Sequence, residues 1–223
     1  MALLSIRRLC ELDEPFVLAP ERYDPRREFS LSSSTSTLPL RTVVELNRKT
    51  LTGPNGDAEH CLIFDTGDAH EGVISGRRQR VPMSAIGSAK KEIRQNDVII
   101  SRLRPYLRQV AFVDTDVPCR GEGVIMLCST EFFVLRPTDH QSIAFLVPFL
   151  LTGKVQKVLA ASQEGGHHPR FSETSLLSLL IPAEILERRE EISKIVESSV
   201  QSFRQSQREM AGVVEITETV IER

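Results

Sequence analysis

The last segment of the chain, residues 183–223, has a pattern that few folds accommodate. It contains no proline and one glycine, Gly212, and its apolar side chains recur close to every seventh residue. One helix from Glu184 to Glu222 would be roughly 58 Å long at about 1.5 Å per residue, more than a compact domain of this size covers. We therefore expect its apolar stripe to pack against another helix, from another chain or a second copy. The expected interface residues are Ile185, Ile192, Val196, Val200, Phe203, Met210 and Val213.

This apolar stripe is interrupted by polar residues. Ser199, Ser206 and Gln207 stand where a strict coiled coil has apolar side chains. Polar residues at such positions reduce stability but fix register and partner choice. The alternative is that the helix lies back on its own domain.

Composition divides the chain into three parts. We expect an N-terminal segment at residues 1–38 that ends in a Ser/Thr cluster, a folded domain at 39–182 and the long helix at 183–223. Spacings of three and four between apolar residues predict a helix from Ser142 to Ala161, which Pro148 and Gly153 divide into two with a turn near Thr152. Short apolar runs predict strands at 62–64, 98–100, 110–113, 123–127 and 132–135.

Length and composition indicate a protein of the cytoplasm. The 223 residues have a net charge of -2, and no apolar run approaches the roughly 20 residues that span a bilayer. The first charges follow the apolar residues, the reverse of a secretory signal, so we expect no contact with a membrane. Four widely spaced cysteines form no Cys-x-x-Cys pair, which favours reduced thiols over a metal site.

Positive charge is concentrated between Arg77 and Arg108. Nine basic residues face two acidic ones, Glu92 and Asp97, a local surplus of seven in an acidic protein. Such a patch predicts a polyanionic partner. Because aromatic residues are 5% of the chain and tryptophan is absent, duplex DNA is favoured over a single strand. The basic residues are Arg77, Arg78, Arg80, Lys90, Lys91, Arg94, Arg102, Arg104 and Arg108.

The sequence contains no specific catalytic or nucleotide-binding motif. The sequence has no phosphate-binding Gly-rich loop, and Gly121-Glu122-Gly123 lacks the third glycine of a nucleotide fingerprint. His60 and Cys61 are adjacent, so on a strand their side chains diverge. We therefore expect no catalytic residue, no metal and no cofactor. A hydrolase that uses His60 or the His167-His168 pair is the least favoured alternative.

Several segments carry a resemblance through their order along the chain: residues 21–25, 96–102, 110–113, 129–137, 165–171 and 176–182. In this order they resemble the specificity subunits of type I restriction-modification systems. Residues 96–102, 110–113 and 129–137 are similar to the central sheet of a target recognition domain. Residues 165–171 and 176–182 look like the closing loop and strand that lead into a long helix, and 21–25 like an N-terminal segment of some members.

The resemblance implies an α+β fold, a mixed α/β target recognition domain with a twisted, mostly antiparallel sheet, followed by one long coiled-coil-type helix. A complete subunit has two recognition domains and two long helices, so this chain looks like a half-subunit. Implied partners are double-stranded DNA, a DNA adenine methyltransferase subunit and a restriction or translocase subunit. Two copies would pair through their helices as a homodimer, or one copy would serve a methyltransferase.

Two kinds of DNA contact are expected. Phosphate contacts give salt-dependent affinity, whereas side chains at loop ends read base edges. We assign Arg77, Arg78, Arg80, Lys90, Lys91 and Arg108 to phosphates, and Arg102, Arg104, Tyr106, His167, His168 and Arg170 to bases. The alternative function is a coiled-coil adaptor that binds an acidic protein.

Overall fold

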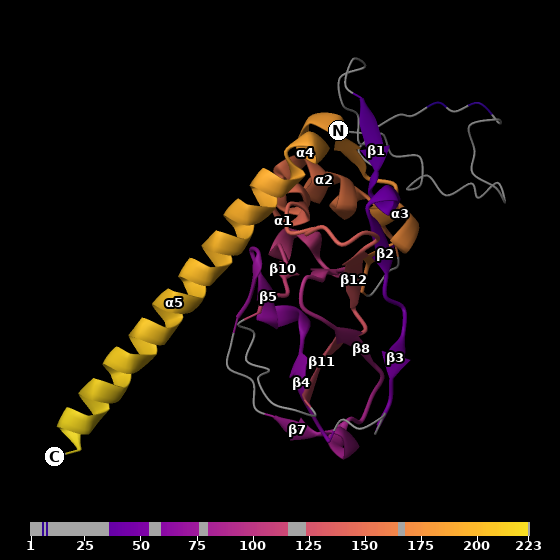
Figure 1. Ribbon diagram of the computed structural model, residues 1–223. Coiled ribbons are helices and arrows are strands. Elements are labelled where there is room, and N and C mark those ends of the chain that lie inside the picture. Colours follow the sequence, from indigo (N-terminus) through magenta and orange to yellow (C-terminus); the bar gives the residue numbers. More distant parts are fainter. Residues whose placement is uncertain are drawn as a thin grey trace.

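Two β-sheets build the body of the protein (Figure 1). The computed structural model describes Ile6, Arg8 and residues 36–53, 59–75, 80–115, 124–164 and 168–222. The four-stranded sheet is antiparallel throughout, in the order β10 (Val110–Phe112), β9 (Val98–Ser101), β12 (Phe132–Pro137) and β2 (Val44–Leu46). The five-stranded sheet has the order β3 (Thr50–Leu51), β8 (Lys90–Ile93), β11 (Val124–Ser129), β4 (His60–Phe64) and β7 (Val81–Pro82).

Antiparallel pairing dominates both sheets. In the five-stranded sheet β11 runs parallel to β4, and the other pairings are antiparallel. Three short antiparallel ribbons complete the strands: β5 (Ala69–His70) with β6 (Val73–Ile74), β13 (Gln163–Glu164) with β14 (Arg170–Phe171), and β1 (Thr37–Pro39) with β15 (Leu180–Pro182). The predicted strands are all present, but they belong to two sheets.

The four-stranded sheet is covered on both faces, which explains the unbroken apolar run in β9. Val98 and Ile100 face the core that α1 (Leu146–Leu151) and α2 (Gly153–Ala161) cover. Ile99 faces the opposite way, into a core shared with β4 and β11 of the other sheet. Because side chains alternate along a strand, a strand buried on both faces reads as a continuous hydrophobic run.

The predicted helix pair and its turn are confirmed. The chain turns at Thr152, whose ψ is 141° and whose hydroxyl accepts a hydrogen bond from the Val155 amide at 3.4 Å. Pro148 lies in the first turn of α1, where its missing N–H would have had no helical partner. A further short helix, α3 (Glu173–Leu177), is capped by Ser172, and the 3₁₀ turns cover Leu40–Thr42, Thr66–Asp68, Met83–Ala85 and η7 (Pro105–Leu107).

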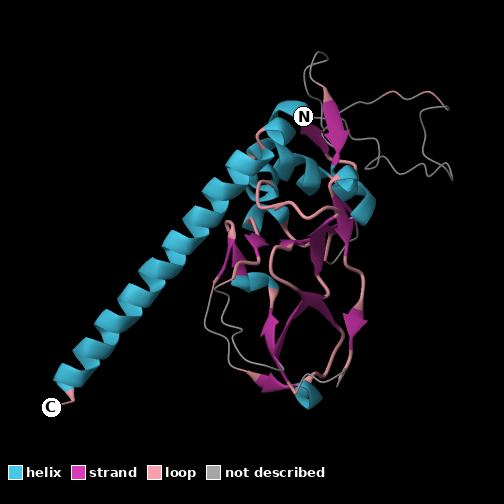
Figure 2. Cartoon of the chain, viewed as in Figure 1, coloured by secondary structure: helices cyan, strands magenta, loops and turns pink. Residues whose placement is uncertain are grey.

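The expectation of one continuous C-terminal helix is corrected. The chain forms α4 (Ala183–Glu187) and then α5 (Arg189–Ile221), with the break at Arg188. The 33 residues of α5 extend for about 50 Å. Figures 1 and 2 show α5 leaving the body as a straight rod that ends far from the sheets.

The first four residues of the predicted partner-helix interface contact the chain's own body. Ile185, Ile192 and Val196 pack against the chain's own helix-side core, and Val200 is buried. The alternative, a helix lying back on its own domain, therefore holds for the first part of α5. Beyond Arg204 the apolar residues are exposed, among them Met210 and Val213.

Polar contacts fasten the start of α5 to the body. The Arg189 guanidinium forms two hydrogen bonds with the Asp139 carboxylate, at 2.8 and 2.9 Å, and lies 5.4 Å from the centre of the Phe145 ring. The Phe145 amide donates to the Ser193 hydroxyl at 3.2 Å. These contacts explain why the polar side chains of Arg189 and Ser193 are buried.

The cysteines that the structure describes, Cys61 and Cys128, are buried. His60, next to Cys61 on β4, is exposed, so the adjacent side chains diverge as expected. Burial raises the pKa of the Cys61 thiol, and raises that of Cys128 to about 12, which keeps both thiols protonated.

Among the helices that the structure describes, none has the length and apolar character needed to cross a membrane.

Candidate functional site

Three segments that are distant in the sequence meet at one end of the four-stranded sheet. The Arg102 amide donates to the Glu131 carbonyl at 3.0 Å, and the Arg102 carbonyl accepts from the Phe171 amide at 3.2 Å. Leu103 and Arg170 form an isolated antiparallel bridge. The backbone therefore brings together two residues that the sequence assigns to base reading, Arg102 and Arg170.

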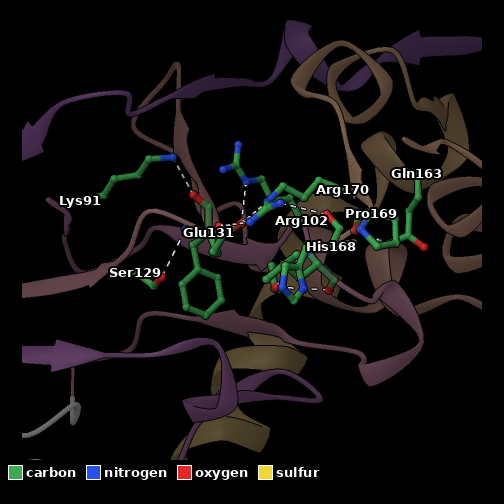
Figure 3. A network of polar contacts seen from close by, with 11 residues as sticks. Lys91, Arg102, Ser129, Glu131, Gln163, His168, Pro169 and Arg170 are labelled. Atoms are coloured by element: carbon green, nitrogen blue, oxygen red, sulfur yellow. Dashed lines mark hydrogen bonds and ion pairs between the residues drawn. The ribbon is translucent and has the colours of Figure 1, made fainter. Parts of the chain in front are cut away.

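The Glu131 carboxylate lies between these two arginines (Figure 3). Its Oε2 accepts from Arg102 Nε and from Arg170 Nε, both at 2.9 Å, and its Oε1 accepts from Arg170 Nη2 at 2.7 Å. Arg170 Nη1 donates to the His168 carbonyl at 2.9 Å. One carboxylate thus fixes two guanidinium groups from different parts of the chain.

This pairing keeps Glu131 ionised. The hydrogen bonds from Arg170 and then Arg102, with the positive charges of both, lower the pKa of Glu131 to about 2 against the opposing effect of burial. The carboxylate is therefore a permanent acceptor at physiological pH, and both arginines remain oriented by it.

Other charged groups surround this triad. Arg48, which follows β2, forms an ion pair with Glu173 at the start of α3. The Lys91 charge interacts with those of Arg102, Glu131 and Glu173. We call these six residues the charged cluster; four basic and two acidic members leave it with a charge of +2. Its members are Arg48, Lys91, Arg102, Glu131, Arg170 and Glu173.

Lys91 differs from the other basic members because its ammonium is directed to the protein. Its Nζ donates to the Phe132 carbonyl at 2.7 Å and lies 5.6 Å from the centre of the Phe133 ring. Burial lowers the pKa of Lys91. The phosphate contact expected for it stays a prediction, but its ammonium already has a backbone acceptor.

The loop beside the charged cluster carries a solvent-exposed aromatic ring. Arg104 and Arg108 flank η7 with φ angles of 44° and 54°, in the left-handed region that residues with side chains seldom adopt. Hydrogen bonds from the Leu107 amide to the Arg104 carbonyl, and from the Arg108 amide to the Pro105 carbonyl, hold this turn. Tyr106 at its tip is 68% exposed. Strain of this kind is concentrated at functional sites.

The remaining predicted contacts are distributed over other elements. Arg80 is exposed before β7, Lys90 donates to the Ser88 hydroxyl at 2.6 Å, and Arg108 pairs with Glu71 at 2.7 Å. His168 is exposed next to β14. Arg77, Arg78 and His167 lie outside the described residues.

Glu131, the acid at the centre of the site, was not predicted from the sequence. Glu131 occupies the turn between the strands β11 and β12, within the segment 129–137 that carried the family resemblance. A single acid between two apolar strands was the available signal. Its pairing with Arg170 depends on a contact 39 residues apart, which no local pattern indicates.

Comparisons with known proteins identify the fold. No protein-family model matches the sequence, and a search of curated proteins found no match. A chain in a structure of a type I R-M system, studied for complex assembly and conformational transition, matches with a TM-score of 0.59 and 23% identity, over 86% of this chain and 48% of that chain. The HsdS subunit from Thermoanaerobacter tengcongensis matches with a TM-score of 0.54 and 22% identity, over the same shares.

At this level of identity the similarity establishes the fold. The predicted class is confirmed: mixed sheets in which antiparallel pairing dominates, followed by a long C-terminal helix. The resemblance to type I specificity subunits is confirmed as a resemblance of fold. The chain spans about half the length of the solved structures it matches.

Proposed function

We propose that this chain is the DNA-recognition subunit of a type I-like restriction-modification or phage-defence methyltransferase complex. It reads duplex DNA in the cytoplasm and directs a partner adenine methyltransferase to its site, without carrying out chemistry itself. The observation that carries the proposal is the match in fold to an HsdS subunit over 86% of the chain. A net positive cluster with two oriented arginines at one end of the sheet supports it.

The division of the chain follows from this role. We propose an N-terminal segment at 1–38, a recognition domain at 39–182 and a docking helix at 183–223. The antiparallel pairing of β1 with β15 supports the boundary at 182/183, since it closes the body where α4 begins, and it attaches the end of the N-terminal segment, Thr37 and Leu38, to the body.

The positions of the basic side chains favour two classes of DNA contact. Arg102, Arg104, Tyr106, His168 and Arg170 lie on or beside the loop and strand that meet at Glu131, which suits contact with bases. Arg80, Lys90 and Arg108 are not among the residues that meet at Glu131, and we assign them to phosphates. Lys91, and Arg77 and Arg78 outside the described residues, keep the phosphate role expected of them. The exposed Arg48, which the sequence analysis did not select, is added to the residues that we propose contact phosphates.

The distal part of α5 supports docking to a helix of another subunit. The exposed large apolar residues of this part are Met210, Val213, Val214, Ile216, Val220 and Ile221, and Ile195 and Phe203 are exposed nearer the body. The chain spans half of its structural relatives, so a second copy would supply the second recognition domain of a bipartite reader. A helix of the methyltransferase is the other occupant, and a translocase subunit would join the assembled complex.

The same exposed residues favour one other function, an adaptor that binds an acidic protein through the charged cluster and another helix through α5. Both functions predict helix pairing, and they differ in DNA binding. An electrophoretic shift with random duplex DNA over a salt series, with and without the methyltransferase subunit, separates them.

For the DNA reader, the logarithm of the association constant falls linearly with the logarithm of salt concentration, with a slope of about -0.9 per phosphate contact. The four contacts from Arg48, Arg80, Lys90 and Arg108 give a slope of roughly -3.6, and each of Lys91, Arg77 and Arg78 that also contacts a phosphate adds about -0.9. Binding that is absent, or insensitive to salt, in both conditions contradicts the proposal and favours the adaptor.

A further inference from the structure

We infer that Arg102 reads a guanine in the major groove, and that Glu131 and Arg170 are positioning residues that orient it. This inference rests on the proposed function and deepens it, because it assigns one base reader among several basic candidates. The assignment comes from the hydrogen-bond donors that remain available on each guanidinium.

Arg170 is engaged through all three of its side-chain nitrogens. Its Nε and Nη2 donate to the Glu131 carboxylate, and its Nη1 donates to the His168 carbonyl. A guanidinium held in this way cannot turn its paired terminal donors toward a base without breaking bonds. Among the residues proposed for base contact, Arg170 is therefore reassigned: it orients Arg102 and does not itself read a base.

Arg102 is engaged through Nε alone. Its Nε donates to Glu131 at 2.9 Å, and no hydrogen bond joins Nη1 or Nη2 to any residue in the described ranges. Figure 3 draws a single dashed line to this group, and its terminal nitrogens point away from Glu131. The fork formed by Nη1 and Nη2 is thus the part of Arg102 that is available to a ligand.

The position of this fork is fixed from both ends. The Arg102 backbone is bonded to Glu131 on one side and to Phe171 on the other, and Nε is held by the carboxylate. The side chain is still 34% exposed. A rigid, exposed pair of N–H donors matches the O6 and N7 acceptors of guanine, the commonest specific contact of arginine in DNA complexes.

A phosphate group also offers two acceptors to the Nη1–Nη2 pair of an arginine, so the hydrogen-bond chemistry alone fits either a DNA phosphate or a guanine base. The position of Glu131 favours the base. A carboxylate that stays ionised repels phosphate oxygens and reduces the charge of the triad from +2 to +1, whereas a base edge carries no net charge. The affinity contributed by a phosphate contact depends on salt and not on sequence, whereas that contributed by a base contact depends on sequence.

The first experiment compares the full-length wild type with Arg102→Lys in selection from a pool of randomised duplexes, followed by titration of the selected duplex. Lysine keeps the positive charge but loses the two-pronged geometry. We expect the wild type to select at least one fixed G·C pair, and Arg102→Lys to lose discrimination at that pair by roughly 10- to 100-fold with the salt slope unchanged. Equal loss for every sequence identifies a phosphate contact and overturns the inference.

The second experiment changes the DNA in place of the protein. Replacing the selected guanine by 7-deazaguanine removes the N7 acceptor and leaves base pairing intact. The wild type should bind this duplex roughly 10-fold more weakly, whereas Arg102→Ala, which has no donor at this position, should bind both duplexes alike. If the wild type does not distinguish them, Arg102 does not read that base, whatever the stability of the variants.

The positioning role of Glu131 predicts two effects of opposite sign. In Glu131→Gln, affinity for random duplex DNA should increase because one negative charge is lost, while the preference for the selected sequence should decrease. Glu173→Gln is the matched control: it removes a carboxylate paired with Arg48 in the same cluster, so random binding should increase and the preference should be retained. A preference that Glu131→Gln leaves unchanged contradicts the positioning role.

These outcomes distinguish the inference from the proposed function. If the wild type selects no sequence at all, the proposal that the chain reads DNA fails. If it selects a sequence in which Arg102→Lys and 7-deazaguanine have no effect, the proposed function holds and the assignment of Arg102 is wrong.

Discussion

Arg204 of α5 and Asp114 after β10 form a buried ion pair that joins two positions 90 residues apart. Arg204 Nη2 lies 2.8 Å from Asp114 Oδ2, and both side chains are 7% exposed. The pair lies near the point where the helix stops contacting the body, because Val200 is buried and Met210 is exposed. It therefore fixes the direction in which the distal part of α5 leaves the body of the protein.

Replacing Asp114 by alanine should destabilise the protein by about 3 to 5 kcal/mol, because it leaves the Arg204 charge buried without its partner. Urea unfolding measures this change. The double variant Asp114→Leu/Arg204→Met removes both charges and should be closer in stability to the wild type than Asp114→Ala is. A double variant as unstable as the single one would show that the ion pair is not the source of the loss.

Val200→Ala should lower the free energy of unfolding by about 1.5 to 2.5 kcal/mol, since it removes two methyl groups from a buried position. Val213→Ala makes the same chemical change at an exposed position of the same helix and should stay within about 0.5 kcal/mol of the wild type. Both values come from denaturant unfolding of the isolated chain at low concentration. Equal costs at the two sites would mean that α5 does not pack on its own domain as described.

The stability contributed by Glu131 should depend on pH. Its pKa is about 2 in the folded protein and has an ordinary value of 4.5, so the contribution is complete above about pH 5.5 and is lost as the pH falls toward 2. Because the site is partly exposed, we expect about 1 to 2 kcal/mol between wild type and Glu131→Gln at pH 7, and less than half of that at pH 3. Urea unfolding at several pH values measures the difference, and a difference that is constant with pH would contradict the pairing.

The left-handed conformation of Arg104 should give glycine an advantage at this position. Arg104→Gly relieves the strain at a φ of 44°, whereas Arg104→Ala keeps it, so the glycine variant should be more stable than the alanine variant by about 1 kcal/mol. Both variants remove the same guanidinium, and both should weaken DNA binding. Thermal unfolding gives the comparison, and an alanine variant at least as stable as the glycine variant would contradict the strained turn.

The sequence predicted which strands and helices form better than which of them pack against one another. The apolar run at 98–100 and the turn at Thr152 both reflect local rules, alternation along a strand and a proline and a glycine within a helical pattern, and both are found. The break at Arg188 was not predicted, because no proline or glycine marks it.

The pattern along α5 could not indicate what covers each part of the helix. Val196 and Val200 recur with the same spacing rules as Met210 and Val213, yet the first pair packs on the body and the second is exposed. Periodicity identifies an apolar face and contains no information on whether the covering surface belongs to the same chain. In the same way, the charge surplus identified the basic residues but not Glu131, the acid that orients two of them. Long-range backbone hydrogen bonds place Glu131 beside these arginines, and no local sequence pattern indicates such bonds.

The central claim, that this chain reads a DNA sequence, is tested most directly by the ratio of its affinities for a selected duplex and for a scrambled duplex of the same length and composition at one salt concentration. Fluorescence anisotropy with this chain, alone and mixed with a DNA adenine methyltransferase subunit, gives both values. We expect a ratio of roughly 1,000 or more, as is typical of sequence-specific DNA-binding proteins. Equal affinity for the two duplexes would contradict it.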